Sequence, residues 1–283
     1  MTGAPEPPPG VDISRPSAAR VYDYLLGGTD NYPPDQMAGE MIKARAPELS
    51  DSAHANRSYH RRVARWLAGQ GIAQYIDIGS GLPTATNTHE IVRRVVPSAR
   101  VVYVDHDPQV LALGSALLGS DPDAIVILAD MRQPGDVLQH PQVRELIDFS
   151  QPAAVLLSSV LHFIPDETDP YGLIRRYRDA LAPGSYLSVS HMTGENKPPQ
   201  AVAALQALGQ SAAEGAFLRD RDAVRGFFDG MEIVPPYPGA DPDVTWVGLW
   251  DCEDPAEADT EDSRWLYCGV GKVLASEPDE DGD

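Results

Sequence analysis

After Gly71 the chain alternates short apolar runs with segments of helical pattern, and this alternation constrains the fold more than any other feature. Such alternation is typical of β-α-β units, in which helices join parallel strands and cover both faces of the sheet. The apolar runs lie at 73–78, 99–105, 124–130, 153–160 and 185–191. We therefore predict an α/β fold with a doubly wound, mostly parallel, Rossmann-like sheet.

The segments around these runs carry the other predicted elements. Helices are expected at 84–96, 108–118, 143–149 and 171–181, and the second has Asp107 at the N-cap position followed by Pro108. Two further helical stretches follow at 199–214 and 220–228, and two extended segments at 231–237 and 264–273. We expect the extended pair to close the sheet as an added edge hairpin.

The chain before the sheet has a different character. Residues 1–13 are rich in proline and glycine and are predicted to form a disordered tail. Apolar residues at helical spacing then predict helices near 18–25, 37–46 and 55–69, the first ending at Gly27 and Gly28. We expect one domain over 14–275, with a helical cap at 14–70, an α/β core at 71–275 and an acidic tail at 276–283.

Composition narrows the classes of partner. The net charge of −20, from 42 acidic and 22 basic residues, would repel a phosphate backbone, so nucleic acid is a poor candidate. No apolar run is long enough to span a membrane, and the N-terminus has no signal-peptide pattern, so we expect a cytoplasmic protein without a membrane partner. Cys252 and Cys268 are expected as free thiols, although two cysteines leave a single bridge open.

Polar residues end each of the first four predicted strands. Because ligands of open parallel sheets bind beyond the carboxyl ends of the strands, these side chains are expected to meet at one edge. The strand ends supply Asp77, Gly79, Ser80 and Gly81, then Asp105, His106 and Asp107, then Asp130 and Met131, and finally Ser158 and Ser159, followed by His162. The sequence therefore predicts a single ligand site at this edge.

The glycine loop after the first strand indicates the kind of ligand. Gly79 and Gly81 allow a tight turn, but the third glycine of a dinucleotide motif is replaced by Thr84, and Pro83 removes an amide that could bind phosphate. Asp77 would also repel phosphate. S-adenosylmethionine carries an ammonium and a sulfonium and no phosphate, so it fits better than NAD, and an NAD-dependent oxidoreductase is the less favoured alternative.

We assign roles around the nucleoside as follows. Asp105 is placed to accept hydrogen bonds from the ribose hydroxyls, and Asp130 from the adenine amino group. His106 and the Met131 backbone are expected beside the adenine ring. A structural interpretation stays open for each residue: a turn for Asp77, Gly79 and Gly81, and a turn after the strand for Asp130.

Together these segments resemble the class I S-adenosylmethionine-dependent methyltransferases, and more closely an actinobacterial family of such enzymes (DUF574 type). The resemblance is carried by PSAARVYDYLLGGTDNYPPD (16–35), ANRSYHRRVARWLA (55–68), IDIGSGLPT (76–84), RVVYVDHDPQVL (100–111) and SVLHFIPDE (159–167). It implies a seven-stranded sheet with a helical cap, and a cofactor held by Asp77, Gly79, Gly81, Asp105 and Asp130. His106 departs from the small residue common beside the ribose-binding acid.

Two further roles concern the cap and the chemistry. Asn31 and Tyr32, in an aromatic loop after a helix, are predicted to contact the cofactor, with core packing of the tyrosines as the alternative. His162 is the candidate base for a hydroxyl or amine acceptor, and His191 is a weaker candidate. No metal site is predicted.

We expect methyl transfer to a small molecule, since the fourth strand also lacks the Asp/Asn-Pro-Pro-aromatic segment of many enzymes that methylate nucleic-acid amines. A non-catalytic module that binds the cofactor is the alternative.

Overall fold

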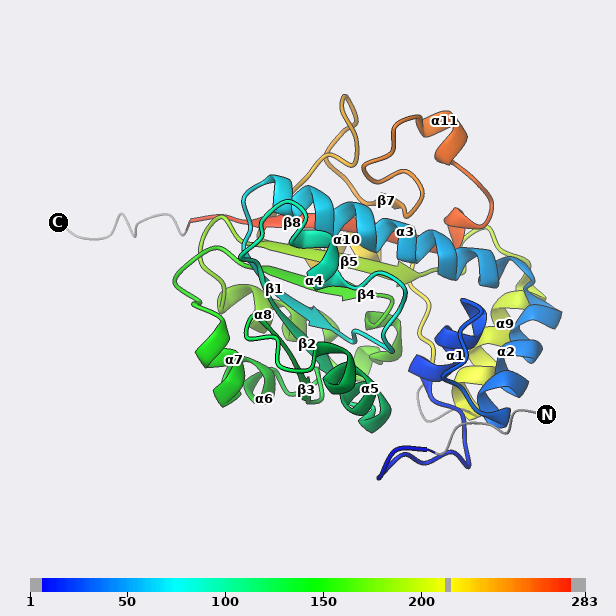
Figure 1. The fold of residues 1–283 in the computed structure, drawn as a ribbon. Coiled ribbons are helices and arrows are strands. Elements are labelled where there is room, and N and C mark those ends of the chain that lie inside the picture. The colour runs from blue at the N-terminus through cyan, green and yellow to red at the C-terminus, as the bar shows by residue number, and fades with distance from the viewer. Residues whose placement is uncertain (1–6, 212–214, 276–283) are drawn as a thin grey trace.

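The computed structural model in Figure 1 describes residues 7–211 and 215–275, and its centre is one mostly parallel sheet. The predicted acidic tail at 276–283 and the first six residues of the predicted N-terminal tail lie outside the described residues. The strands are β1 (Gln74–Ile78), β2 (Arg100–Asp105), β3 (Ala124–Leu128), β4 (Ala154–Ser158), β5 (Tyr186–Met192), β6 (Met231–Ile233), β7 (Thr245–Trp246) and β8 (Leu266–Val273). The predicted α/β class is confirmed.

Strand order reverses in the middle of the sheet. The order is β3-β2-β1-β4-β5-β8-β6, with β7 paired to β8. The first five strands pair in parallel, and β8 pairs antiparallel with both β5 and β6. The chain reverses its winding between β1 and β4, which is where doubly wound sheets bind ligands. The two predicted extended segments do pair, but β8 lies between β5 and β6, and the added β7 makes eight strands where seven were expected.

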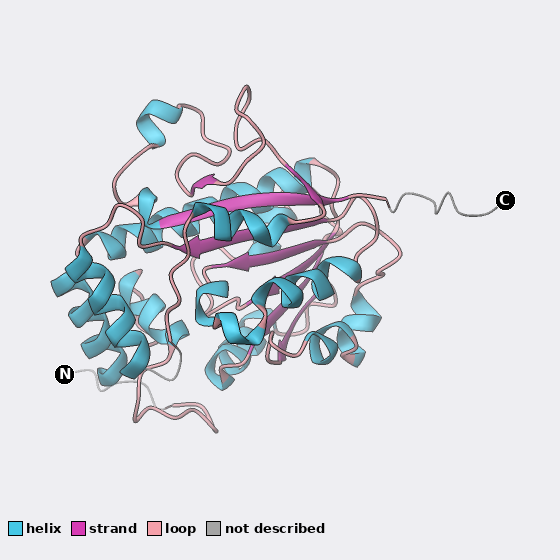
Figure 2. Cartoon of the chain, turned by 180° about the vertical axis from the view of Figure 1, so that it is seen from behind, coloured by secondary structure: helices cyan, strands magenta, loops and turns pink. Residues whose placement is uncertain are grey.

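Helices cover both faces of the sheet, as Figure 2 shows from behind. The cap consists of α1 (Ala18–Leu25), α2 (Pro33–Arg45) and α3 (Glu48–Gly69). The core helices are α4 (Thr88–Val92), α5 (Pro108–Leu118), α6 (Pro134–Leu138), α7 (Pro141–Leu146), α8 (Pro170–Asp179), α9 (Pro199–Ser211), α10 (Arg221–Arg225) and α11 (Pro255–Ala258). None of the described helices is long and apolar enough to cross a membrane, and Cys252 and Cys268 are free thiols.

Side chains alternate between the two faces of each strand, and this alternation sets where the polar strand ends point. Ile76 and Ile78 of β1 pack in the core that contains α7 and α8, whereas Tyr75 packs with α3 on the opposite face. Asp77 therefore points to the α3 face. Asp105 falls on the same face of β2 as Val101, which also packs with α3, so the two carboxylates share one side of the sheet.

The structure corrects the predicted helix after β1. A helix was expected over 84–96, but α4 spans only Thr88–Val92. Asn87 and Glu90 form a capping box that begins the helix late: the Glu90 carboxylate accepts from the Asn87 backbone amide at 2.7 Å. Residues 79–87 are left as a loop. The loop at the switch point is therefore longer than the glycine pattern indicated.

Helix α3 joins the cap to the sheet through a buried tyrosine. Tyr59 is fully buried, and its hydroxyl lies 2.7 Å from Ser188 Oγ and 3.0 Å from the Gly269 carbonyl oxygen. These partners belong to β5 and β8, so one side chain connects α3 to two neighbouring strands. An unpaired hydroxyl here would be costly to bury, and the pairing makes the position specific for tyrosine.

We expect Tyr59→Phe to lower the free energy of unfolding by about 1–2 kcal/mol, because Ser188 loses a partner in a dry interior. Urea unfolding measures the change. The matched control is Tyr24→Phe, whose hydroxyl bonds Glu40 at an exposed position and should cost no more than about 0.5 kcal/mol. Equal effects of the two substitutions would contradict this assignment.

Candidate cofactor and active site

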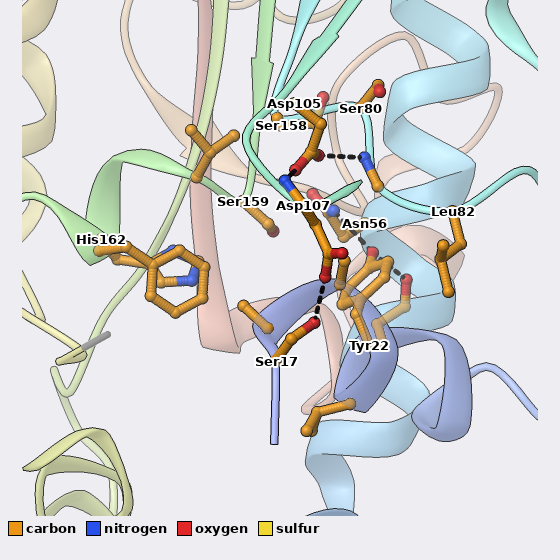
Figure 3. A pocket seen from close by; sticks show the side chains of 18 of the residues that line it. Ser17, Tyr22, Asn56, Ser80, Leu82, Asp105, Asp107, Ser158, Ser159 and His162 are labelled. Atoms are coloured by element: carbon orange, nitrogen blue, oxygen red, sulfur yellow. Dashed lines mark hydrogen bonds between the residues drawn. The ribbon is translucent and has the colours of Figure 1, made fainter. Parts of the chain in front are cut away.

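A cavity of about 350 Å³ opens at the carboxyl edge of the sheet, where α1, α2 and α3 lie over the strand ends (Figures 1 and 3). This volume lies at the lower end of the range usual for small-molecule sites. The predicted site residues that line it are Asp77, Gly79, Ser80, Gly81, Asp105, His106, Asp130, Met131, Ser158 and His162. Residues from four strand ends thus meet at one cavity, as expected.

Asp77 is the most deeply placed carboxylate of this set. Its side chain accepts a hydrogen bond from Thr88 Oγ1 at 2.6 Å and is only 4% exposed. Burial raises the pKa of Asp77 to about 6. The site therefore holds a carboxyl group whose pKa is close to neutral pH. A positively charged ligand beside it would favour its ionised form.

A chain of hydrogen bonds runs from Asp77 to the end of β4 through His60 of α3. Thr88 Oγ1 donates to Asp77 and accepts from His60 Nε2, which lies 2.8 Å away. His60 Nδ1 then accepts from Ser158 Oγ at 2.9 Å. Burial lowers the pKa of His60 to about 3, so the ring is neutral, in keeping with this pattern of donors. Ser158 is thus oriented by a cap residue.

Asp105 is held by backbone amides at the end of β2. Its Oδ2 accepts from the Gly81 amide at 2.9 Å and its Oδ1 from the Asp107 amide at 3.0 Å, as part of Figure 3 shows. Burial raises the pKa of Asp105, which is 7% exposed. Each carboxylate oxygen retains a further lone pair, so Asp105 can accept two more bonds from a ligand.

The site residues that follow β3 are more exposed than Asp77 and Asp105. Asp130 is about one-third exposed and accepts several hydrogen bonds from Arg132, the shortest at 2.6 Å. Partial burial raises the pKa of Asp130, but the bonds from Arg132 outweigh it and hold the pKa below its ordinary value. His106 Nδ1 lies 3.7 Å from Asp105 Oδ1, and the Met131 carbonyl accepts from Tyr177 Oη at 2.8 Å.

The two glycines of the loop have different surroundings, because Gly79 is closely packed and Gly81 faces open space. Both have positive φ, +65° at Gly79 and +67° at Gly81, a conformation that strains other residues. A Cβ at Gly79 would lie 2.8 Å from Val160, so Gly79 permits close packing against the end of β4. A Cβ at Gly81 would meet no atom within 4 Å, so the Gly81 backbone faces open space. This is the geometry expected where a ligand approaches the backbone.

Asn56, Arg57 and His60 of α3 also line the cavity, although their sequence pattern alone did not predict a role for them. Asn56 bridges the cap and the core: its Nδ2 donates to Tyr22 Oη at 2.9 Å and its Oδ1 accepts from Ser190 Oγ at 2.6 Å. Arg57 donates to Thr84 Oγ1 at 2.8 Å. A signal existed, since Asn56 and His60 are polar residues on the otherwise apolar face of a helix.

His162 lines the cavity on the side of the chain that follows β4, as Figure 3 shows. Its side chain is 3% exposed, and its Nδ1 makes no hydrogen bond with any residue that the structure describes. Burial lowers the pKa of His162 to about 3, and the nearby Arg219 charge adds to this effect. The ring is neutral and has an unsatisfied nitrogen, which is rare for a buried group.

His191, the weaker candidate base, is already committed to other partners. Its Nδ1 donates to the Met192 carbonyl at 2.7 Å, which leaves Nε2 to accept from Arg219 Nη1 at 2.7 Å. Arg219 also donates to Asp166 and to the carbonyls of Leu161 and Ile164. With both ring nitrogens occupied, His191 has no site for a substrate proton.

Asn31 and Tyr32 do not line the cavity. The Asn31 amide donates to Asp23 at 2.8 Å and to the Gly28 carbonyl at 3.0 Å, so it holds the loop after α1. Tyr32 is 3% exposed and precedes α2 as its N-cap. From the cap, Ser17 and Tyr22 line the cavity instead. Asn31 and Tyr32 therefore stay outside the cofactor set that we propose below.

A doubly wound sheet with buried carboxylates and a glycine turn at its switch point is typical of α/β enzymes that bind a nucleoside-containing cofactor. The family model described as S-adenosyl methyltransferase matches residues 5–274, so this chain belongs to that family. The protein is therefore an S-adenosylmethionine-dependent methyltransferase, and the alternative of an NAD-dependent oxidoreductase is not supported. The predicted resemblance is confirmed.

Two solved structures are similar over nearly the whole chain. A candidate methyltransferase from Thermobifida fusca YX is 40% identical, with a TM-score of 0.87, and the match covers 95% of this chain and 99% of that one. A DUF574 family protein from Streptomyces avermitilis MA-4680 is 35% identical, with a TM-score of 0.85, covering 93% and 99%. No functionally curated protein matches the chain.

The raised pKa of Asp77 predicts a pH dependence of stability in the cofactor-free protein. Because the folded-state pKa is about 6 and the unfolded value is about 4, the Asp77 carboxyl contributes stability below about pH 4, which is lost as the pH rises through about 6. Asp77→Asn does not ionise, so we expect it to gain roughly 1–3 kcal/mol relative to the wild type between these limits.

Urea unfolding at several pH values from about 4 to about 7 measures this difference. The exposed Asp179→Asn variant is the control and should follow the wild type throughout. If Asp77→Asn also runs parallel to the wild type, the Asp77 carboxyl has no raised pKa.

Proposed function

We propose that this methyltransferase transfers a methyl group to a small molecule by in-line displacement within the cavity at the sheet edge. The observation that carries the proposal is that Asp77 and Asp105 face one cavity from neighbouring strands, beside the open backbone of Gly81. Bound there, S-adenosylmethionine supplies an electrophilic methyl group on a sulfonium. The residues present fit such a group, since carboxylates dominate the charged part of the lining.

The cofactor set that we propose follows the strand ends. Asp105 accepts from the ribose hydroxyls, and Asp130 accepts from the adenine amino group, with His106 and Met131 beside the ring. Asp77, Gly79, Ser80, Gly81 and Ser158 surround the methionine part. Arg57 joins this set, because its guanidinium beside Thr84 is a cation at the glycine loop and suits the cofactor's carboxylate.

Methyl transfer from a sulfonium requires mainly that the protein orients the two reactants and excludes water. The new bond to the acceptor forms as the bond between methyl carbon and sulfur breaks, and the acceptor releases a proton. We propose His162 as the group that takes this proton, because its buried Nδ1 has no other partner among the described residues. The pKa of about 3 makes it a weak base, so the proton passes on to solvent.

A small molecule is favoured as the acceptor by charge and by shape. The net charge of −20 opposes binding of nucleic acid. The cap helices also cover the cavity on the side opposite the strand ends, and a covered cavity suits a compact ligand more than a polymer. We propose that residues 14–275 act as one unit in this function, because the cap supplies part of the lining.

We expect Asp105→Ala to weaken binding of S-adenosylhomocysteine by at least about 100-fold. Two hydrogen bonds to a charged acceptor are lost, each contributing about 1.5–3 kcal/mol. Isothermal titration calorimetry measures the affinity, and circular dichroism confirms that the variant is folded. The control is Asp179→Ala at the exposed end of α8, which does not line the cavity and should change the affinity less than about twofold.

Transfer of a radiolabelled methyl group from S-adenosylmethionine to a panel of small molecules then tests the reaction itself. Asp105→Ala should lose the transfer at cofactor concentrations that saturate the wild type. Tight cofactor binding by the wild type with no methylated product from any acceptor would argue against this function, and unchanged affinity in Asp105→Ala would argue against the site.

A further inference from the structure

The cavity has a part that the proposed cofactor contacts leave unused. Beyond the carboxylates of the strand ends, its walls come from the cap helices, from α9 and from the ends of β5 and β8. These walls are mainly apolar, with Asp23, Ser52 and Asn56 of the cap as polar members. The side chains that form them include Leu25, Ile42, Leu49, Met192, Leu205 and Leu266. Figure 1 shows α1, α2 and α9 together beyond the carboxyl ends of the parallel strands. An apolar chamber therefore adjoins the polar edge.

Two polar residues from the chain after β4, Ser159 and His162, line the cavity beside these walls. His162 is buried, and its Nδ1 has no hydrogen-bond partner among the described residues. Ser159 follows β4 with a φ of +58°, a strained conformation for a residue with a side chain, and it lines the same cavity. Figure 3 shows Ser159 between His162 on one side and Asp105 and Asp107 on the other. Both groups thus lie where the cofactor edge meets the apolar chamber.

We propose that the methyl acceptor is a neutral, mainly apolar small molecule whose hydroxyl group is held by His162 and Ser159. This inference rests on the proposed function and names the substrate class of that same site. The ring or chain of the acceptor fills the chamber lined by Leu25, Ile42 and Leu205. Its hydroxyl donates to His162 Nδ1, which otherwise has no partner among the described residues, and accepts from Ser159 Oγ.

The charges around the chamber disfavour ionised acceptors. The Arg219 charge acts on His162, but its guanidinium is fully engaged with Asp166, His191 and two carbonyls. Of the described arginines that line the cavity, Arg132 is paired with Asp130 and Arg57 is assigned above to the carboxylate of the cofactor, so an acceptor carboxylate is left without a cation. Burying that carboxylate among leucines without a partner would be costly. An ammonium group, in turn, would have to approach the sulfonium, and two like charges at contact repel.

The transfer step balances with a hydroxyl acceptor. The bond from oxygen to the methyl carbon forms as the bond from that carbon to sulfur breaks, which leaves a neutral sulfide. The hydroxyl proton passes to His162 Nδ1 and then to solvent. Ser159 acts here as a positioning residue, since its hydroxyl contacts the acceptor oxygen without taking the proton.

Binding to the full-length protein saturated with S-adenosylhomocysteine tests this inference. The probes are 2-naphthol, naphthalene, 2-naphthoate and 2-(aminomethyl)naphthalene, which share one ring system and differ in the polar group. We expect 2-naphthol to bind about 25-fold more tightly than naphthalene, from two neutral hydrogen bonds that contribute about fivefold each, and at least tenfold more tightly than either ion. Equilibrium dialysis gives all four affinities.

Variants then locate the hydroxyl. His162→Phe and Ser159→Gly should each reduce the affinity for 2-naphthol about fivefold, leave naphthalene binding unchanged, and change the affinity for S-adenosylhomocysteine less than about twofold. The Ser159→Gly variant also relieves the strained φ, so it should fold and can test the hydroxyl contact even if the His162 variant fails to fold. Ala38→Phe, which adds volume at the cavity wall, should weaken both neutral probes at least tenfold.

The outcomes separate this inference from the function on which it rests. If S-adenosylhomocysteine binds but 2-naphthoate or the amine binds as tightly as 2-naphthol, the acceptor class is wrong and the methyltransferase site stands. If 2-naphthol keeps its full wild-type advantage over naphthalene in both variants, His162 and Ser159 do not hold the hydroxyl. Failure of the wild type to bind S-adenosylhomocysteine would instead overturn the proposed site.

Discussion

Burial of carboxylates at the ends of β1 and β2 is the constraint on which the rest of this structure depends. Asp77 and Asp105 are 4% and 7% exposed, and a carboxylate that leaves water needs hydrogen-bond donors. The chain supplies them in two ways, through the Thr88 hydroxyl for Asp77 and through the amides of Gly81 and Asp107 for Asp105. Neither set includes a full counter-charge at contact distance. The edge is therefore left favourable to a cationic ligand.

The same edge is where the cap meets the core. Tyr59 bonds Ser188, Asn56 bonds Ser190 and His60 bonds Ser158, so successive turns of α3 contact serines of β5 and β4. At the other side, Ser17 Oγ donates to Asp107 at 2.6 Å and attaches α1 to the start of α5. Because these bonds surround the cavity, a substitution at the site affects cap docking as well as ligand binding. Affinity and stability have to be measured together.

The sequence predicted well what depends on local pattern, and less well what depends on tertiary partners. The strands ending in Asp77 and Asp105 follow from apolar runs and their polar ends, and the cavity contains both residues. The late start of α4 depends on the capping box at Asn87, which a glycine-loop pattern does not reveal. His60 was missed because its partners, Thr88 and Ser158, are distant in sequence. The cofactor roles themselves remain predictions.

Neutral imidazoles complete the electrostatic character of the site. Burial lowers the pKa of both His60 and His162 to about 3, so neither ring carries a positive charge near pH 7. A charged ring in either place would repel a sulfonium and would weaken the attraction that Asp77 provides. By contrast, the neutral His60 ring still orients Ser158, and the neutral His162 ring still offers a lone pair to a methyl acceptor. Depth of burial thus makes these histidines compatible with a cationic cofactor.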